Sequence, residues 1–393
     1  MSDISKGMEE IAEWQRTLVG LTLHPRWPHF NTEATRDNIR RFCIGIGDYN
    51  PLYRDEEYAR RTHYGQLVAP PNFLESVMHT GAGNTTLGNM ATVPDTIGMD
   101  GGTDWEWYKP LLVGDRFTYA QKLLDIAEKQ TRSFGRAFVT HAETIIWNQH
   151  NEVVAKARGR VFWAEKPIGG AKPRPVHRYS GEELRAIGNA YRSESIRGGT
   201  PRFWEDVQVG EELNPIVRGP LDHEDLVAFL VGAGAEGIRA HRRLAYPGGT
   251  PDLHHSKGKQ VFQEPVNTAD WMMDSFGGGR PQGMMRHVDE SVSEEQGVGV
   301  PYDFAQQRMS WFITLFTNWQ GDTGFLKQLS AQLKGVNQLG DTTWFKGRVV
   351  KKEVLSGEHL VHIECWGENQ LGSITTPGSA TVVLPSREAT TAR

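Results

Sequence analysis

One motif occurs twice in this chain. The first copy has an aspartate among its reactive positions and the second has a histidine, and neither copy has both. The first copy contains Asp48 and Tyr53 and continues to Gly65. The second contains His287 and continues to Gly299. Tyr53 lies twelve residues before Gly65, and His287 lies twelve before Gly299, so a tyrosine stands where the second copy has its histidine. A duplicated segment with one histidine-bearing copy predicts two half-sites that no longer do the same chemistry.

These residue types suit acid–base chemistry. An imidazole such as that of His287 has its ordinary pKa near neutrality, as a general base requires. Four carboxylates are candidates for its partner: Asp289, Asp48, Glu236 and Asp303. Asp289 is also placed to cap the helix that follows it, as Asp55 is in the first copy, because a carboxylate accepts hydrogen bonds from the first N–H groups of a helix. Tyr53 is either a hydrogen-bond donor in the site or a filler of the first copy.

A strongly apolar stretch follows each motif copy. Apolar residues keep helical spacing over residues 304–319 and predict a helix buried on nearly all sides. Residues 71–79 predict its counterpart in the first copy. The backbone N–H groups of Tyr302 and Asp303 precede the second helix, where partial positive charge collects, and are candidate donors to an oxyanion. Pro301 has no N–H to offer.

Two shorter helices and two runs of antiparallel strands are expected around these buried helices. Residues 38–42 predict a helix that ends near Gly47, and residues 225–229 predict one that ends near Gly234. Residues 359–366 alternate between two unlike faces, which is the period of a strand. The turns at 148–151 and 367–370 each follow a tryptophan and precede a further strand, as in a hairpin. The pattern predicts an α+β fold in which an antiparallel sheet wraps one long buried helix in each half.

The composition excludes several classes of protein. The chain of 393 residues is long enough for two domains, and its net charge of −5 gives no general affinity for nucleic acid. No apolar run of 18 residues and no charged-then-apolar leader occurs, so we expect a cytoplasmic protein that does not enter a membrane. Cys43 and Cys365 fall in apolar segments of different halves and are expected to be buried free thiols.

The repeats predict the domain boundaries. The first half covers residues 1–165, a Pro-, Gly- and Arg-rich linker covers 166–202, and the second half covers 203–393. An insertion at 237–286 has no counterpart in the first half and is expected to be a lid or an oligomer contact. Its first arginines either bind phosphates of the substrate or form a solvated face: Arg239, Arg242 and Arg243. His254 and His255 lack the spacing of a helical metal site, and no metal is expected.

At these residues the chain resembles the MaoC-like acyl dehydratase and (R)-specific enoyl-CoA hydratase family in its double hotdog form. Residues 47–53 with Gly65 resemble the hydratase motif, residues 203–213 the opening strand, and residues 340–342 the turn after the central helix. The likeness covers roughly residues 10–165 and 200–385. It implies hydration of a 2-enoyl-CoA thioester, or the reverse dehydration, without metal or organic cofactor.

The departures from the family motif leave the reaction open. The family motif has an aspartate followed five residues later by a histidine, whereas the first half has Asp48 and Tyr53, and the position matching Asp48 in the second half falls on Ala235. A hydratase acting on a bulky acyl-CoA is favoured, and a homodimer is possible. A thioesterase on the same fold is disfavoured because the second buried helix has no carboxylate after Asp303. A non-catalytic subunit, or another lyase or cyclase, is the third reading.

Overall fold

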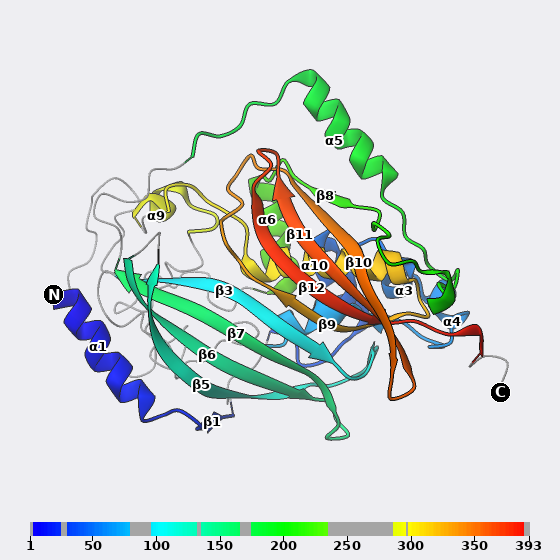
Figure 1. The fold of residues 1–393 in the computed structure, drawn as a ribbon, viewed down its shortest axis with the longest axis horizontal. Helices are drawn as coiled ribbons and strands as arrows, with labels where there is room; N and C mark the ends of the chain where they lie inside the picture. The colour runs from blue at the N-terminus through cyan, green and yellow to red at the C-terminus, as the bar shows by residue number, and fades with distance from the viewer. Residues whose placement is uncertain are drawn as a thin grey trace.

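The computed structural model describes residues 3–24, 30–78, 96–131, 135–165, 174–234, 286–295 and 298–388 (Figure 1). The insertion predicted at 237–286, apart from Arg286, lies outside these residues, as do Arg239, Arg242 and Arg243. In the described part of the chain, no helix has the length and apolarity needed to span a bilayer.

One ten-stranded antiparallel sheet runs through both halves of the chain, in the order β1-β5-β6-β7-β3-β9-β12-β11-β10-β8. The first half supplies β1 (Thr22–Leu23), β3 (Thr96–Trp107), β5 (Thr118–Thr131), β6 (Gly135–Trp147) and β7 (Val153–Glu165). The second half supplies β8 (Ile216–Arg218), β9 (Phe325–Ala331), β10 (Thr343–Leu355), β11 (Glu358–Asn369) and β12 (Ile374–Val383). Read outwards from the centre, the two halves have the same order of strands, so the predicted duplication is a duplication of fold.

The halves are joined by a short ladder between β3 and β9. Asp104 pairs with Ser330, Glu106 pairs with Gln328, and Trp105 pairs with Leu329 between them. These are the innermost strands of the two half-sheets, and their contact turns two five-stranded sheets into one continuous surface (Figure 1).

The turns repeat the same hydrogen bonds in both halves. Asp115 accepts a hydrogen bond from the backbone N–H three residues earlier (2.8 Å) and from the Gln149 side chain (3.1 Å). Asp341 accepts the equivalent bonds (3.0 Å), with Gln370 in the place of Gln149 (2.7 Å). Identical polar contacts at two turns confirm the repeat independently of the strand order.

The second hairpin turn lies later than predicted. Asn148 and Asn369 each accept hydrogen bonds from the backbone N–H groups two and four residues ahead, so these asparagines are equivalent. Strand β11 therefore continues through Asn369, and its turn starts at Gln370 rather than at Gly367. A tryptophan precedes both turns, but the two tryptophans are not equivalent positions, because an asparagine that caps its own turn sets the geometry.

The predicted helix over 304–319 is α10 (Ala305–Gln320), and all of its residues from Gln307 onward are buried. It lies against the sheet, where Phe312 meets Phe345 edge to face with ring centres 4.8 Å apart. Its counterpart starts differently: residues Pro71–Ser76 form a buried 3-10 helix, η1, and residues 79–95 lie outside the described part. Val68–Ala69 (β2) and Leu111–Leu112 (β4) form a separate two-stranded ladder beside η1.

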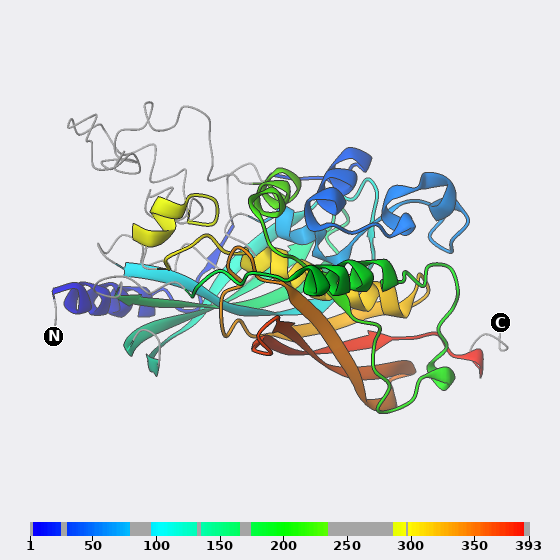
Figure 2. The same cartoon turned by 90° about the horizontal axis from the view of Figure 1, so that it is seen from above.

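Two shorter helices meet where the halves touch on the helical side of the sheet. These are α2 (Arg36–Ile46) and α6 (His223–Ala233), and they end at Gly47 and Gly234 as predicted. Figure 2 shows both on the same side of the sheet as α10. They cross at Gly45 and Gly232, which are equivalent positions. A methyl group at Gly45 would lie 2.7 Å from the carbonyl oxygen of Ala228, so only glycine permits this approach.

The remaining helices take no part in the crossing of α2 and α6. They are α1 (Asp3–Arg16), α3 (Pro51–Arg54), α4 (Glu56–Arg60), α5 (Gly181–Ser193), η3 (Trp204–Asp206) and α9 (Glu290–Glu295). Cys43 and Cys365 are free and buried, as predicted. The fold class is α+β, a double hotdog.

The helix crossing predicts a stability difference between two Gly→Ala substitutions. Gly45→Ala is expected to lower the free energy of unfolding by about 1–3 kcal/mol, because the added methyl overpacks a backbone contact. Gly188→Ala in α5 is the control. Its methyl meets only the mobile end of Arg192 at 3.4 Å, so a gain of up to about 1 kcal/mol is expected from helix propensity. Urea unfolding measures both, and equal stabilities would contradict the crossing.

Candidate functional site

The first motif copy places Asp48 against the central helix of the other half. Gly47 ends α2 in a left-handed conformation (φ 67°), and Asp48 follows it into the interior, where it is 2% exposed. Its carboxylate accepts hydrogen bonds from the Asn50 backbone N–H (2.9 Å) and from the Thr314 hydroxyl of α10 (3.2 Å). Burial raises the pKa of Asp48, and these two hydrogen bonds oppose the rise. The carboxyl is thus easier to protonate than an exposed one.

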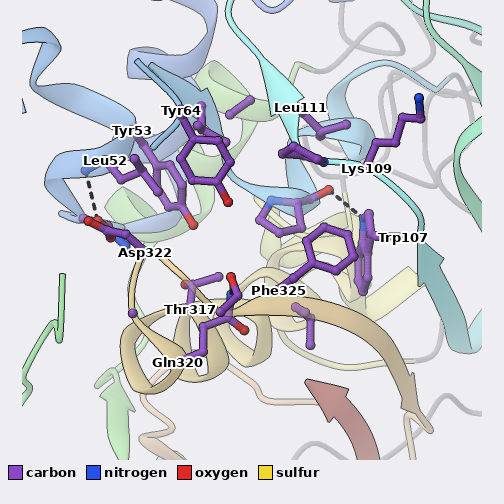
Figure 3. A pocket seen from close by; sticks show the side chains of 18 residues that line it. Leu52, Tyr53, Tyr64, Trp107, Lys109, Leu111, Thr317, Gln320, Asp322 and Phe325 are labelled. Atoms are coloured by element: carbon purple, nitrogen blue, oxygen red, sulfur yellow. Dashed lines mark hydrogen bonds between the residues drawn. The ribbon is translucent and has the colours of Figure 1, made fainter. Parts of the chain in front are cut away.

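Tyr53 lies one turn further, on α3, and faces a cavity (Figure 3). Burial raises the pKa of its phenol well above the ordinary value, with the negative charge of Asp48 as the second cause and a hydrogen bond to Thr317 opposing it. Tyr53 therefore stays protonated and is a hydrogen-bond donor at neutral pH.

The walls of this cavity come from both halves. Apolar side chains make up most of it, including Leu52, Trp107 and Phe325, while Tyr53, Tyr64, Thr317, Gln320 and Asp322 supply polar atoms. The hydroxyl of Tyr58 donates to Asp322 at 2.6 Å just behind the wall. A mostly apolar cavity with a few polar groups is typical of a small-molecule site.

Sequence reasoning missed the residues that α10 contributes beside Asp48 and Tyr53. Thr314 binds Asp48, while Thr317 and Gln320 line the cavity, and these three buried polar residues are spaced three apart on the helix. Such a stripe lies on one face of a helix, so the spacing was a usable signal. The sequence alone could not predict which half of the molecule this helix face contacts.

The second motif copy buries His287 on the other side of the pseudo-twofold axis. The ring is 6% exposed and stacks on Phe304 with centres 4.0 Å apart. Its Nδ1 donates a hydrogen bond to the Tyr302 carbonyl oxygen at 2.8 Å. A carbonyl oxygen only accepts, so the ring proton sits on Nδ1 and the lone pair sits on Nε2.

Burial also keeps His287 uncharged. Desolvation lowers the pKa of His287 to about 3, and the positive charge of Arg286 adds to this effect, while backbone contacts with Tyr302 and Asp303 oppose it. The imidazole is therefore neutral at physiological pH. The lone pair on Nε2 can accept a proton, but the pKa of His287 lies well below the near-neutral value that the sequence led us to expect for a general base.

Asp289 has the geometry of a helix cap. Its carboxylate accepts hydrogen bonds from the backbone N–H groups of Ser291 (3.0 Å) and Val292 (3.2 Å) at the start of α9. Asp55 caps α4 in the same way in the first half. The two caps are equivalent, and they place Tyr53 and His287 at equivalent positions two residues before each of them.

The predicted oxyanion donors lie in a short strand contact. Tyr302 bridges to Gln338, as Val68 pairs with Leu112 in the first half. The Asp303 N–H donates to the Asn337 carbonyl oxygen at 3.0 Å, so that N–H is already bonded. The Asp303 carboxylate forms a buried ion pair with Arg308 of α10. Asp303 thus anchors the start of α10, and its carboxylate is committed to an arginine.

Asp48 and His287 belong to different half-sites. Asp48 is bonded to Asn50 and Thr314, and His287 to Tyr302, so neither completes the other within the described residues. Glu236 lies outside the described part of the chain.

Comparison with known proteins identifies similar sequences and a similar fold. The FAS1-like dehydratase domain region family matches residues 24–157. A UPF0336 protein of Thermobifida fusca is 33% identical over 137 residues, covering 35% of this chain and 88% of that protein. A 3-oxo-4,17-pregnadiene-20-carboxyl-CoA hydratase alpha subunit of Mycobacterium tuberculosis is 26% identical over 200 residues, covering 48% of this chain and 61% of that subunit. A solved MaoC-like dehydratase has the same fold, with a TM-score of 0.61 at 16% identity over 95% of this chain and 99% of that one.

The chain belongs to the MaoC-like dehydratase family. This MaoC-like protein is a hydro-lyase-type enzyme of hydratase or dehydratase character. The structural likeness spans both halves, whereas the family match lies in the half that carries Tyr53.

The neutral state of His287 in this MaoC-like protein predicts a pH dependence of stability. In the unfolded chain its pKa is about 6.5, so the unfolded state takes up a proton as the pH falls below that value, whereas the folded state does so only near pH 3. Between pH 7.5 and 5 this difference is expected to remove about 2 kcal/mol of stability. His287→Gln should lose that part of the pH dependence in urea unfolding. Parallel pH profiles for variant and wild type would mean that His287 is not buried neutral.

Proposed function

We propose that the protein hydrates a 2-enoyl-CoA thioester, or dehydrates a 3-hydroxyacyl-CoA, with His287 as the general base. The single observation that carries this proposal is the His287 ring, which is buried, neutral and fixed by Tyr302 with its lone pair on Nε2. Hydration needs a base that accepts a proton from water while the new C–O bond forms at C3. A ring of this protonation state and fixed orientation meets that need.

The nature of the substrate is inferred from relatives. The Mycobacterium tuberculosis relative is named as a hydratase of a CoA thioester with a large ring system. A probable enoyl-CoA hydratase alpha subunit of Thermomonospora curvata is 28% identical over 137 residues. We therefore propose an acyl-CoA substrate, and a bulky acyl group fits both the relative and a chain with 12 tryptophans.

The thioester oxygen needs hydrogen-bond donors when it takes on enolate character. The peptide N–H of Tyr302 stays our proposal for this role, and the Asp303 N–H would have to leave Asn337 to join it. We also keep Arg239, Arg242 and Arg243 as proposed partners of CoA phosphates, a homodimer as the proposed assembly, and the cytoplasm as the proposed location. Asp289 is the weakest of the proposed catalytic residues, because capping α9 already uses its carboxylate.

Thioester hydrolysis on the same scaffold has less support. It would need a carboxylate on α10 to activate water, and Asp303 at its start is paired with Arg308. No observation on the described residues favours a purely non-catalytic role.

The test is a panel of 2-enoyl-CoA and 3-hydroxyacyl-CoA esters, from short linear chains to ring-bearing groups, followed by the enoyl absorbance. His287→Ala is expected to lower kcat by about 100-fold or more, because general acid–base groups contribute that much. Tyr53→Phe is the matched control, since it changes the equivalent residue of the other half, and it should cost only a few-fold.

Free thiol release without change in the enoyl absorbance would instead indicate a thioesterase. Full activity of a stably folded His287→Ala variant would remove His287 from the mechanism.

A further inference from the structure

The second half-site lacks an aspartate in its own motif, and the opposite half supplies one at the start of β3. This residue is Asp100, which no sequence motif singles out. Resting on the hydratase function proposed above, we propose that Asp100 is the carboxylate of the His287 site. It would exchange a proton with C2 of the acyl group while His287 exchanges one with water.

The strand registers of the two halves place Asp100 in this site. Val161 of β7 and Val382 of β12 are equivalent, because each stands thirteen residues after the asparagine that caps the preceding turn. Val161 pairs with Asp100 on β3, and Val382 pairs with Leu326 on β9, so Asp100 and Leu326 are equivalent. Leu326 lines the cavity of Tyr53. Asp100 is therefore expected to face the His287 site in the same way.

A direct contact brings the start of β3 to the residues around His287. Met99, the neighbour of Asp100, receives the Tyr302 hydroxyl at its sulfur at 3.8 Å. Tyr302 is the residue whose carbonyl oxygen holds the His287 ring. The start of β3 also lies on the same side of the molecule as α9 in both views of the ribbon (Figures 1 and 2).

The electrostatics connect the same residues. The positive charges of Arg286 and Arg308 act on the pKa of His287 and on that of Asp100 alike. Arg286 lies with its guanidinium carbon 5.8 Å from the centre of the Tyr302 ring. Two arginines that act on both groups place Asp100 and His287 in one electrostatic environment.

The local structure of Asp100 leaves it able to carry a proton. Oδ1 accepts the backbone N–H of Gly102 at 2.8 Å and so shapes the bulge in β3. Burial raises the pKa of Asp100, while that hydrogen bond and the charges of Arg160, Arg308 and Arg286 oppose the rise. A carboxyl that is easier to protonate than an exposed one suits a general acid.

The proton balance closes with these two residues. In hydration, an O–H bond of water breaks, its proton passes to Nε2 of His287 and its oxygen bonds to C3. The π electrons of the C2=C3 bond move to C2, through the thioester enolate, and C2 takes the proton of the Asp100 carboxyl. Return of the proton from the imidazolium to the carboxylate through solvent restores both groups, and the net change is addition of one water.

Asp100→Asn tests the assignment, because an amide oxygen still accepts the Gly102 N–H while the ionisable group is gone. We expect kcat to fall by about 100-fold or more and KM to change by only a few-fold. In the double variant Asp100→Asn/His287→Ala, the fold-loss of kcat should be far less than the product of the two single losses, because the two residues act as a unit. Asp104→Asn on the same strand is the control and should keep near-normal kcat.

Asp48→Asn separates the two half-sites. A large loss of kcat in Asp48→Asn, with normal kcat in Asp100→Asn, would assign the carboxylate to the first half and overturn the proposal.

If wild-type protein turns over no ester of the panel, the hydratase proposal fails, and urea unfolding then tests whether Asp100 and His287 share a site. The midpoint shifts of Asp100→Asn and His287→Gln should then be non-additive in the double variant. Additive shifts would show that the two residues do not share a site.

Discussion

The ladder between β3 and β9 is the contact on which the rest of the molecule depends. It pairs only a few residues from each half, yet it turns two half-sheets into one surface. Because the ladder is antiparallel and lies close to the pseudo-twofold axis, the start of each of its strands extends into the opposite half. Each candidate site is consequently assembled from both halves: Asp48 meets Thr314, and Tyr302 meets Met99.

Desolvation then decides what each site can do. The interior around α10 penalises charge, so it raises the pKa of Asp48 and lowers that of His287. Both shifts favour the neutral forms. Where a charge is retained, as in Asp303, a buried arginine compensates it. An uncharged base and an easily protonated acid are what proton transfer to and from a thioester substrate requires, so the burial that stabilises the fold also sets the protonation states.

The sequence predicted the parts of the fold that depend on local periodicity. The helix ends at Gly47 and Gly234, the buried helix over 304–319 and the duplicated caps at Asp55 and Asp289 all follow from spacing and residue type. The late turn at Gln370 was missed because the two tryptophans outweighed the asparagine that caps the turn.

The composition of the sites could not be predicted in the same way. Thr314, Thr317 and Asp100 reach their places through the pairing of strands and helices far apart in the chain, and one sequence carries no signal for that pairing. In the family motif the aspartate and the histidine lie five residues apart in one copy. In this fold, side chains of the two halves come together across the pseudo-twofold axis.

The two halves share their structural contacts but not their reactive residues. The turns at Asp115 and Asp341 retain the same hydrogen bonds, because each half-sheet needs its own turn to close. The glycines at the crossing of α2 and α6 are retained for the same reason, since either side chain would separate the halves. The fold does not require the same residue at the reactive position of both halves, so a tyrosine can stand in one half where the other has a histidine. In a duplicated fold, the turns and helix contacts therefore stay symmetric, while the reactive residues of the two halves can differ.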